Sequence, residues 1–201
     1  MPQKTSIVQY FELDPLGESE MDYCFANIGS AKLGFDSLAL NKGTSVKEES
    51  PDGWPEPRVG LDEDTPGLIH PDFIGNTDGV LVSSKIMAEL ILSRNVGQIE
   101  TIPFVLLNHR GHIHSRDYLF LNPLGTFDVM HMKKSEYRRY KNGTVSPIGI
   151  GLVLDKSKLE SLPELFRLRE DPQRYILAEP LVADLRKHKF SNLVLNELDV
   201  A

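Results

Sequence analysis

The feature that most constrains the fold of this chain is an internal repeat. Residues 79–105 and residues 174–198 each contain a short apolar strand, an amphipathic helix and a second apolar strand. One such unit cannot bury both its helix and its sheet, whereas two units can share a core. In the alignment that we favour, Leu81-Val82 matches Ile176-Leu177, Ile86-Met87-Ala88-Glu89-Leu90 matches Leu181-Val182-Ala183-Asp184-Leu185, and, after a one-residue slip, Val96-Gly97-Gln98-Ile99 matches Phe190-Ser191-Asn192-Leu193. The repeat predicts two strand–helix–strand units, with Leu90 and Leu185 at equivalent buried positions.

The rest of the chain favours strands over helices. A hairpin is expected where "NHRG" separates two apolar runs, and "TSIVQYFELD" is typical of an opening strand. Further strands are predicted in "YCFANIG", "FDSLAL", "VSPIGIGLVLD" and "LPELFRLRE", and a polar helical turn in "KKSEYRRY". The sequence therefore predicts an α+β fold with a mixed or antiparallel sheet and a few packed helices.

The length and composition indicate one domain. The chain has 201 residues, of which 40% are hydrophobic and 25% charged, so a sizeable core is expected. We assign residues 1–71 to an N-terminal strand region that belongs to the same domain as an α+β core over residues 72–201. Residues 48–71 contain five prolines and no apolar period, which predicts a long irregular loop.

The single cysteine and the apolar pattern bear on location. Cys24 is the only cysteine, so no disulfide can form within the chain, and we expect it to be a small core residue in a reducing compartment. The N-terminus has no apolar segment of the kind found in signal peptides, and no apolar run is long enough to span a membrane. The sequence therefore predicts a cytoplasmic protein.

Nearly all of the net charge lies in one segment. The formal charge is −7, and residues 48–67 hold seven acids and one base. Trp54, the only tryptophan, lies within them, and tryptophan is common at the centre of protein interfaces. We interpret Trp54, Glu56, Asp62, Glu63 and Asp64 as candidate contacts to a partner with a basic surface. The alternative is a solvating loop whose tryptophan folds back onto the core.

Two further clusters allow other functions. His109, His112 and His114 lie together in "NHRGHIH", and an H-x-H pair on a strand is an arrangement that can bind zinc. The simpler interpretation is a polar hairpin tip in water. Lys133, Lys134, Arg138, Arg139 and Lys141 surround two tyrosines in "HMKKSEYRRYK". Because the sequence pI is about 5.4, we interpret this stretch as a solvated face and expect no nucleic-acid partner.

The chain resembles a family of bacterial immunity proteins. The string "DGVLVSSKIMAELI", then "YLFLNPLGTFDVMHMKKSEY", "GLVLDKSKL", "LFRLRE" and "YILAEPLVADLRKHKFSNLVLNEL" is similar to the eleventh numbered immunity family of polymorphic-toxin systems, over residues 72–198. The resemblance implies a protein that binds and neutralises a cognate toxin, often a nuclease, and it supplies no catalytic residue.

The sequence therefore predicts an immunity protein that acts by stoichiometric binding, as a monomer or small homo-oligomer. No phosphate-binding loop, nucleophile elbow or paired-cysteine motif occurs, so we predict no catalytic residue, metal or cofactor. Two alternatives remain: a metal-dependent enzyme that uses His112 and His114, and a scaffold or regulatory module of a secretion or phage-related locus.

Overall fold

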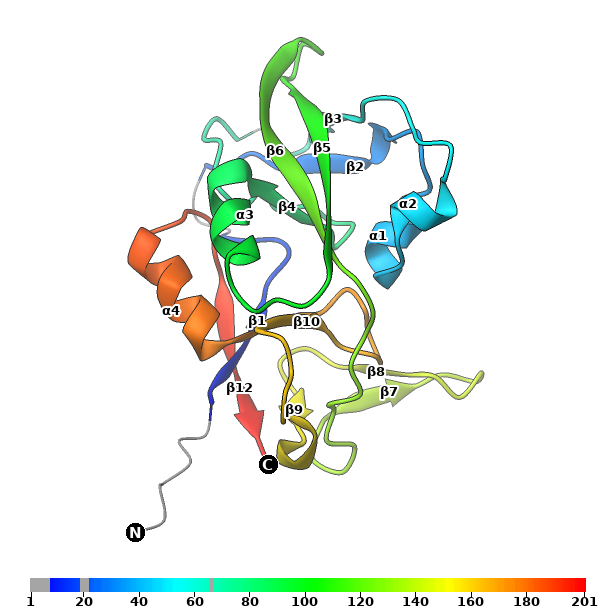
Figure 1. The fold of residues 1–201 in the computed structure, drawn as a ribbon, viewed down its shortest axis with the longest axis vertical. Coiled ribbons are helices and arrows are strands. Elements are labelled where there is room, and N and C mark those ends of the chain that lie inside the picture. The colour runs from blue at the N-terminus through cyan, green and yellow to red at the C-terminus, as the bar shows by residue number, and fades with distance from the viewer. Residues whose placement is uncertain (1–7, 19–21, 66) are drawn as a thin grey trace.

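The computed structural model describes residues 8–18, 22–65 and 67–201 and has an α+β fold (Figure 1). Its two main sheets have five strands each, with the strand orders β2-β3-β5-β6-β4 and β10-β11-β1-β12-β9. We call them the upper and the lower sheet, as they lie in Figure 1. A third, two-stranded sheet pairs β7 with β8.

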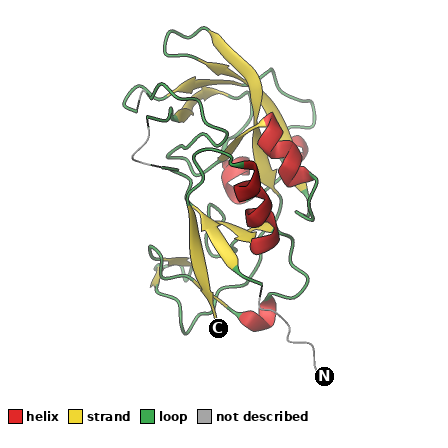
Figure 2. Cartoon of the chain, turned by 90° about the vertical axis from the view of Figure 1, so that its left-hand side faces the viewer, coloured by secondary structure: helices red, strands yellow, loops and turns green. Residues whose placement is uncertain are grey.

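The upper sheet is formed by β2 (Ala26–Lys32), β3 (Arg58–Leu61), β4 (Leu81–Ser84), β5 (Ile99–Leu107) and β6 (Ile113–Pro123). The lower sheet is formed by β1 (Tyr10–Leu13), β9 (Val153–Leu154), β10 (Leu165–Arg167), β11 (Tyr175–Ala178) and β12 (Leu195–Val200). The small sheet is β7 (Tyr137–Arg139) with β8 (Val145–Pro147). The helices are α1 (Leu38–Lys42), α2 (Val46–Glu49), α3 (Lys85–Leu92) and α4 (Glu179–His188), with a 3₁₀ turn at Lys156–Lys158. The strands of the two main sheets lie toward the two ends of the molecule, with helices between them (Figure 2).

The predicted repeat is present as two strand–helix–strand units, β4–α3–β5 and β11–α4–β12. In each unit a third strand lies between the two repeated ones and runs antiparallel to both: β6 between β4 and β5, and β1 between β11 and β12. The helices α3 and α4 contact each other, and both bury their apolar side chains in one cluster with strands from both sheets. The two units therefore share a core, as the sequence predicts.

The alignment of the two helices differs from the predicted one by a residue. Ser84 and Ala178 occupy the N-cap positions, and from there the order of buried and exposed residues is identical along both helices. Ile91, and not Leu90, is thus the equivalent of Leu185. Ile86, which the predicted alignment matches to the fully buried Leu181, is 70% exposed. The cap decides the phase of the helix, because the Ser84 hydroxyl accepts a hydrogen bond from the Met87 N–H.

A carboxylate connects the two units at their helix ends. The Asp72 carboxylate accepts hydrogen bonds from the hydroxyl of Ser84 at 3.0 Å and from the hydroxyl and N–H of Ser191 at 2.9 and 3.0 Å. Ser84 caps α3, and Ser191 lies in the loop after α4. Asp72 therefore fixes the start of α3 against the loop that follows α4.

A buried arginine connects the two sheets. Arg167 of β10 is fully buried and stacks over the Tyr175 ring at 4.5 Å from its centroid. Burial lowers the pKa of the guanidinium, which interacts with carbonyl dipoles and with no described carboxylate. Its acceptors are the carbonyl oxygens of Leu40, Pro123 and Pro172 and the side-chain oxygen of Asn122, at 2.6 to 3.0 Å. Since Pro123 ends β6, these bonds join the lower sheet to the upper one.

Several local predictions are wrong. Residues 48–71 are not irregular throughout, because they contain β3, a central strand of the upper sheet whose Val59 is completely buried. "FDSLAL" leads into α1 instead of forming a strand, and "KKSEYRRY" contains β7 instead of a helical turn. "VSPIGIGLVLD" is divided into β8 and β9 by a turn at Gly149, where φ is +51°. Cys24 is buried as predicted, and the described part of the opening strand is β1.

Candidate functional site

Three of the predicted partner contacts lie where the strands β3 and β5 of the upper sheet end. β3 runs parallel to β5, with Gly60 opposite Leu107. The two strands therefore end side by side, and the residues after β3 lie beside the turn that follows β5. The acidic turn (Asp62, Glu63 and Asp64) comes directly after β3, and the hairpin turn (residues 108–111) comes directly after β5.

The acidic turn and the hairpin turn form an open hollow of about 360 Å³. It is lined by Asn27, Ser30, Gly60, Leu61, Asp62, Glu63, Asp64, Leu107, Asn108, His109 and Gly111. Its walls combine exposed carboxylates with the polar side chains of Asn27, Asn108 and His109. Such a surface can bind cationic groups of a partner.

Local hydrogen bonds fix the shape of this hollow. The Asp62 carboxylate accepts from the N–H groups of Asp64 and Thr65 at 3.0 and 2.9 Å, which closes the acidic turn. On the other side, the Asn108 side chain accepts from the N–H groups of Arg110 and His112. Within the described residues, no salt bridge involves Asp62, Glu63 or Asp64. The turn thus presents three carboxylates whose charges no described lysine or arginine neutralises by contact.

The other two predicted contacts lie elsewhere. Glu56 forms a salt bridge with Arg116 of β6, so its charge is already paired. Trp54 is half-buried, packs against the core cluster of the upper sheet and meets Phe35 edge to face, with ring centroids 5.3 Å apart. This packing favours the alternative in which the tryptophan folds back onto the core.

Sequence reasoning missed the polar partners of the acidic turn. Asn108 and His109 belong to the predicted hairpin, but their place beside Asp62 depends on the pairing of β3 with β5. The signal was weak, because "RVGL" is a four-residue strand between a proline-rich stretch and an acidic one. Only a prediction of β3 would have brought the two turns together.

The three histidines of the hairpin do not converge. His109 lies in the turn, His112 precedes β6, and the ring of His114 stacks on His70 with centroids 3.8 Å apart. Among the described residues, no group of three His, Cys, Asp or Glu side chains could hold a metal ion. The partner of His114 is therefore His70, a residue that the sequence analysis did not single out.

Cys24 lies beside His70, with its sulfur 3.4 Å from the Nδ1 atom. Burial raises the pKa of the Cys24 thiol to about 11, so at neutral pH it is protonated. Burial, with contributions from His114 and His109, lowers the pKa of His70. A protonated, fully buried thiol is a poor nucleophile. The contact is therefore a structural hydrogen bond that holds the loop before β4 against the segment before β2.

Comparison with known proteins leaves function to the geometry. No protein-family model matches this chain, and no curated protein matches it either. Among the described helices, none has the length and apolar character needed to cross a membrane.

Proposed function

We propose that this protein is an immunity protein that binds a cognate bacterial toxin or effector in the cytoplasm and neutralises it by forming a stoichiometric complex. The observation that carries the proposal is the hollow where the acidic turn meets the hairpin turn. It gathers on an open surface the carboxylates of Asp62, Glu63 and Asp64, which form no salt bridge with any described residue.

The chemistry of this surface suits a basic partner. Toxins that cleave nucleic acids need a positive surface to hold phosphate groups, and a negative surface attracts such a protein from solution. Carboxylates at an exposed rim act mainly on the rate of association. Salt weakens this electrostatic attraction, because the screening length is about 8 Å at physiological ionic strength.

The position of the acidic turn supports binding without a large rearrangement. β3, which ends at Leu61 directly before Asp62, is paired on both sides, by β2 and by β5. Val59 of β3 is fully buried, so the strand is fixed in the core immediately before the acids begin. Charges held on a fixed frame lose less conformational entropy on binding than charges on a free loop.

The test is protection of cells from the protein encoded by the preceding reading frame. That protein is expressed with the wild-type chain or with the triple variant Asp62→Asn, Glu63→Gln, Asp64→Asn. We expect the wild-type chain to restore growth and the triple variant to restore it poorly.

The matched control neutralises three other exposed acids of the same segment, Glu48→Gln, Glu49→Gln and Asp52→Asn, which lie at or after α2. Both triple variants change the net charge equally, so only a local role of the acidic turn distinguishes them. Equal protection by all three proteins would contradict the assignment of this surface, and lack of protection by the wild-type chain would contradict the proposed function.

A further inference from the structure

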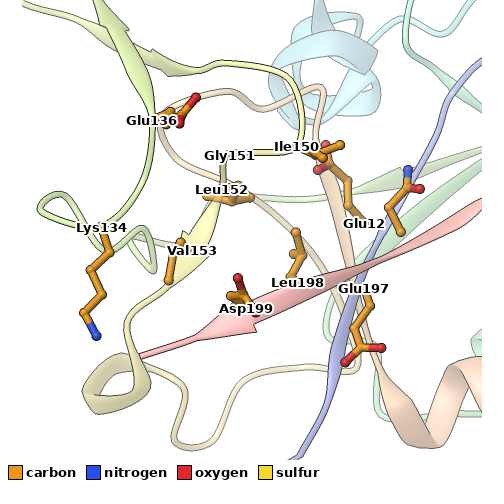
Figure 3. A pocket seen from close by; sticks show the side chains of 11 residues that line it. Glu12, Lys134, Glu136, Ile150, Gly151, Leu152, Val153, Glu197, Leu198 and Asp199 are labelled. Atoms are coloured by element: carbon orange, nitrogen blue, oxygen red, sulfur yellow. The ribbon is translucent and has the colours of Figure 1, made fainter.

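A second acidic surface lies on the lower sheet, in a groove of about 450 Å³ beside β12 (Figure 3). It is lined by Glu12, Lys134, Glu136, Ile150, Gly151, Leu152, Val153, Asn196, Glu197, Leu198 and Asp199. Four of these residues are acids and one is a base. Ile150, which is 88% exposed, adds an apolar side chain at the rim. The groove shares no residue with the hollow of the acidic turn.

Within the described residues, no strand pairs with part of the edge of β12 in this groove. β12 pairs with β1 from Leu195 to Leu198, but with β9 only at Asp199 and Val200. The Asp14 N–H bonds to the Val194 carbonyl, and hydrogen-bonded pairs alternate along antiparallel strands.

The alternation gives the direction of the free backbone groups. The pair of Glu12 with Asn196 is hydrogen-bonded, so Leu195 and Glu197 direct their N–H and carbonyl groups away from β1. No described backbone group bonds to Leu195 or Glu197 on that side. The backbone groups of Glu197 therefore face the groove, and those of Leu195 extend the same free edge just beyond it. Residues from both faces of β12 line the groove.

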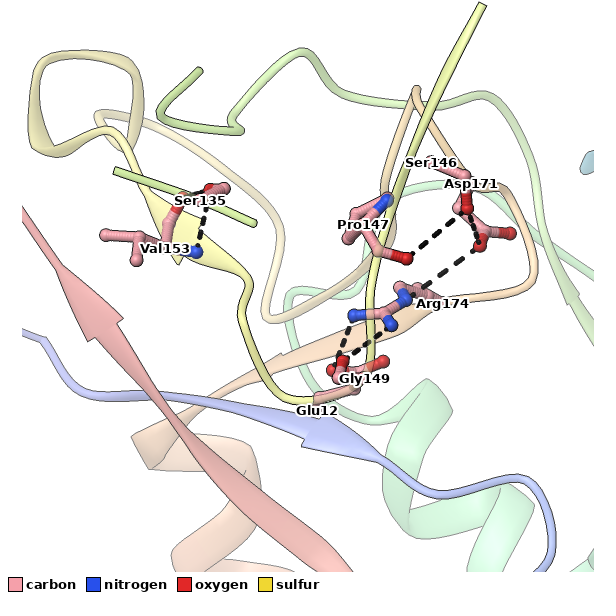
Figure 4. Close-up of polar contacts among 8 residues, drawn as sticks. All are labelled: Glu12, Ser135, Ser146, Pro147, Gly149, Val153, Asp171 and Arg174. Carbon is pink, nitrogen blue, oxygen red and sulfur yellow. Dashed lines mark hydrogen bonds and ion pairs between the residues drawn. The ribbon is translucent and has the colours of Figure 1, made fainter. Parts of the chain in front are cut away.

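The segment that could pair with this edge is held elsewhere, in part by Arg174, whose contacts to Gly149 and Glu12 are drawn in Figure 4. The Glu136 N–H bonds to the Gly151 carbonyl at 2.8 Å, and the Ile148 N–H bonds to the Glu136 carbonyl at 3.0 Å. Arg174 donates to the Gly149 carbonyl at 2.7 Å and to the Glu12 carboxylate at 3.2 Å. Residues 148–151 are thereby drawn away from β12 before they reach β9.

We propose that this groove binds an extended segment of a partner protein that carries lysine or arginine side chains, and that the segment adds a strand to the free edge of β12. An unpaired strand edge supplies main-chain hydrogen bonds to an extended peptide. Side chains that alternate along such a peptide would reach Glu197 and Asp199 on one face of the sheet and Glu136 on the other. The apolar part of the peptide would cover Ile150. This inference does not depend on the proposed function.

The test measures the binding of short peptides to the full chain. The probes are blocked heptapeptides in which lysine or arginine alternates with valine, threonine or isoleucine, and the controls carry glutamate in place of the basic residues. Calorimetry gives the affinity, and NMR shifts of backbone amides locate the site. We expect the basic peptides to bind and to shift the amides of Leu195 and Glu197, and the glutamate peptides not to bind.

Two variants at one position separate the backbone from the charge. Glu197→Ala removes the carboxylate and keeps the N–H, whereas Glu197→Pro removes both. Proline is tolerated on a strand edge where the N–H makes no ladder bond, as inferred for Glu197. We expect Glu197→Pro to weaken binding at least about tenfold more than Glu197→Ala, since the peptide loses a main-chain bond. Thermal unfolding of both variants verifies that they are folded.

A further variant does not depend on proline at this position. Glu136→Gln with Asp199→Asn keeps every backbone group and should weaken the basic peptides by about tenfold at low salt. Three outcomes would overturn the proposal: no binding by any basic peptide, equal binding by the alanine and proline variants when both are folded, or shifts confined to another surface. A dimer in light scattering that Glu197→Pro abolishes would also overturn it, because the occupant would then be a second copy of this chain.

Discussion

Replacing Arg167 should destabilise the fold strongly, because four acceptors depend on this one buried side chain. In Arg167→Ala the three carbonyl oxygens and the Asn122 oxygen lose their donor. Each buried acceptor left unpaired costs about 1–3 kcal/mol, so four give an upper figure of roughly 12 kcal/mol. Water that enters the vacated space recovers part of this. We therefore expect a loss of at least about 4 kcal/mol, against a total stability of about 5–15 kcal/mol for a domain of ordinary stability.

Arg167→Lys gives an intermediate case that should remain folded. The ammonium keeps the charge and donates to fewer acceptors, and it lacks the planar face that stacks on Tyr175. We expect a loss of about 2–3 kcal/mol. The assay is urea unfolding followed by tryptophan fluorescence and by circular dichroism. An Arg167→Ala protein within about 1 kcal/mol of wild type would show that these four hydrogen bonds contribute little to stability.

Three other predictions concern stability. Ile91→Ala and Leu185→Ala should each cost about 2–5 kcal/mol in urea unfolding, and Leu90→Ala clearly less; an equal loss at Leu90 would restore the original alignment. Although burial raises the pKa of Glu100, hydrogen bonds from residues 45–47 and 122 outweigh it and hold the pKa below its usual value. The stability that its charge contributes is thus present above about pH 4.3 and is lost as the pH falls through the lowered folded pKa. Glu100→Gln should therefore destabilise at pH 7, and the difference in stability from wild type should shrink as the pH falls below about 4.3. A difference that stays constant with pH would count against this role of the Glu100 charge. Trp54→Ala should cost about 2 kcal/mol in thermal unfolding, and an unchanged melting temperature would place Trp54 outside the core.

The sequence was sufficient for the two repeat units because their signals are local. Apolar spacing and a closing strand occur in both copies, and each helix has a local start signal: the capping Ser84 in one copy and Pro180 in the first turn of the other. The structure has both units. The phase was wrong by one residue since matching Leu90 to Leu185 maximises similarity of residue type. The cap at Ser84 decides instead, and it places Ile91 on the buried face.

β3 was missed for the opposite reason. Its four residues include a glycine and follow a stretch with three prolines, so the local pattern is that of a loop. Pairing with β2 and β5 makes it a strand, and β-propensity depends strongly on such context. The candidate site was therefore predicted only in part: the acids could be named from composition, but their neighbours at the hairpin turn could not.

The proposed function is tested most directly by the rate at which this chain associates with its proposed toxin, taken as the protein that the preceding reading frame encodes. Association rate constants are measured at about 0.05 M and about 0.5 M salt, between which the screening length shortens severalfold. We predict that the triple variant of Asp62, Glu63 and Asp64 associates about tenfold more slowly at low salt and approaches wild type at high salt. The control variant of Glu48, Glu49 and Asp52 should change much less. Equal slowing by both variants, or no slowing by either, would contradict the claim that the acidic turn receives the toxin.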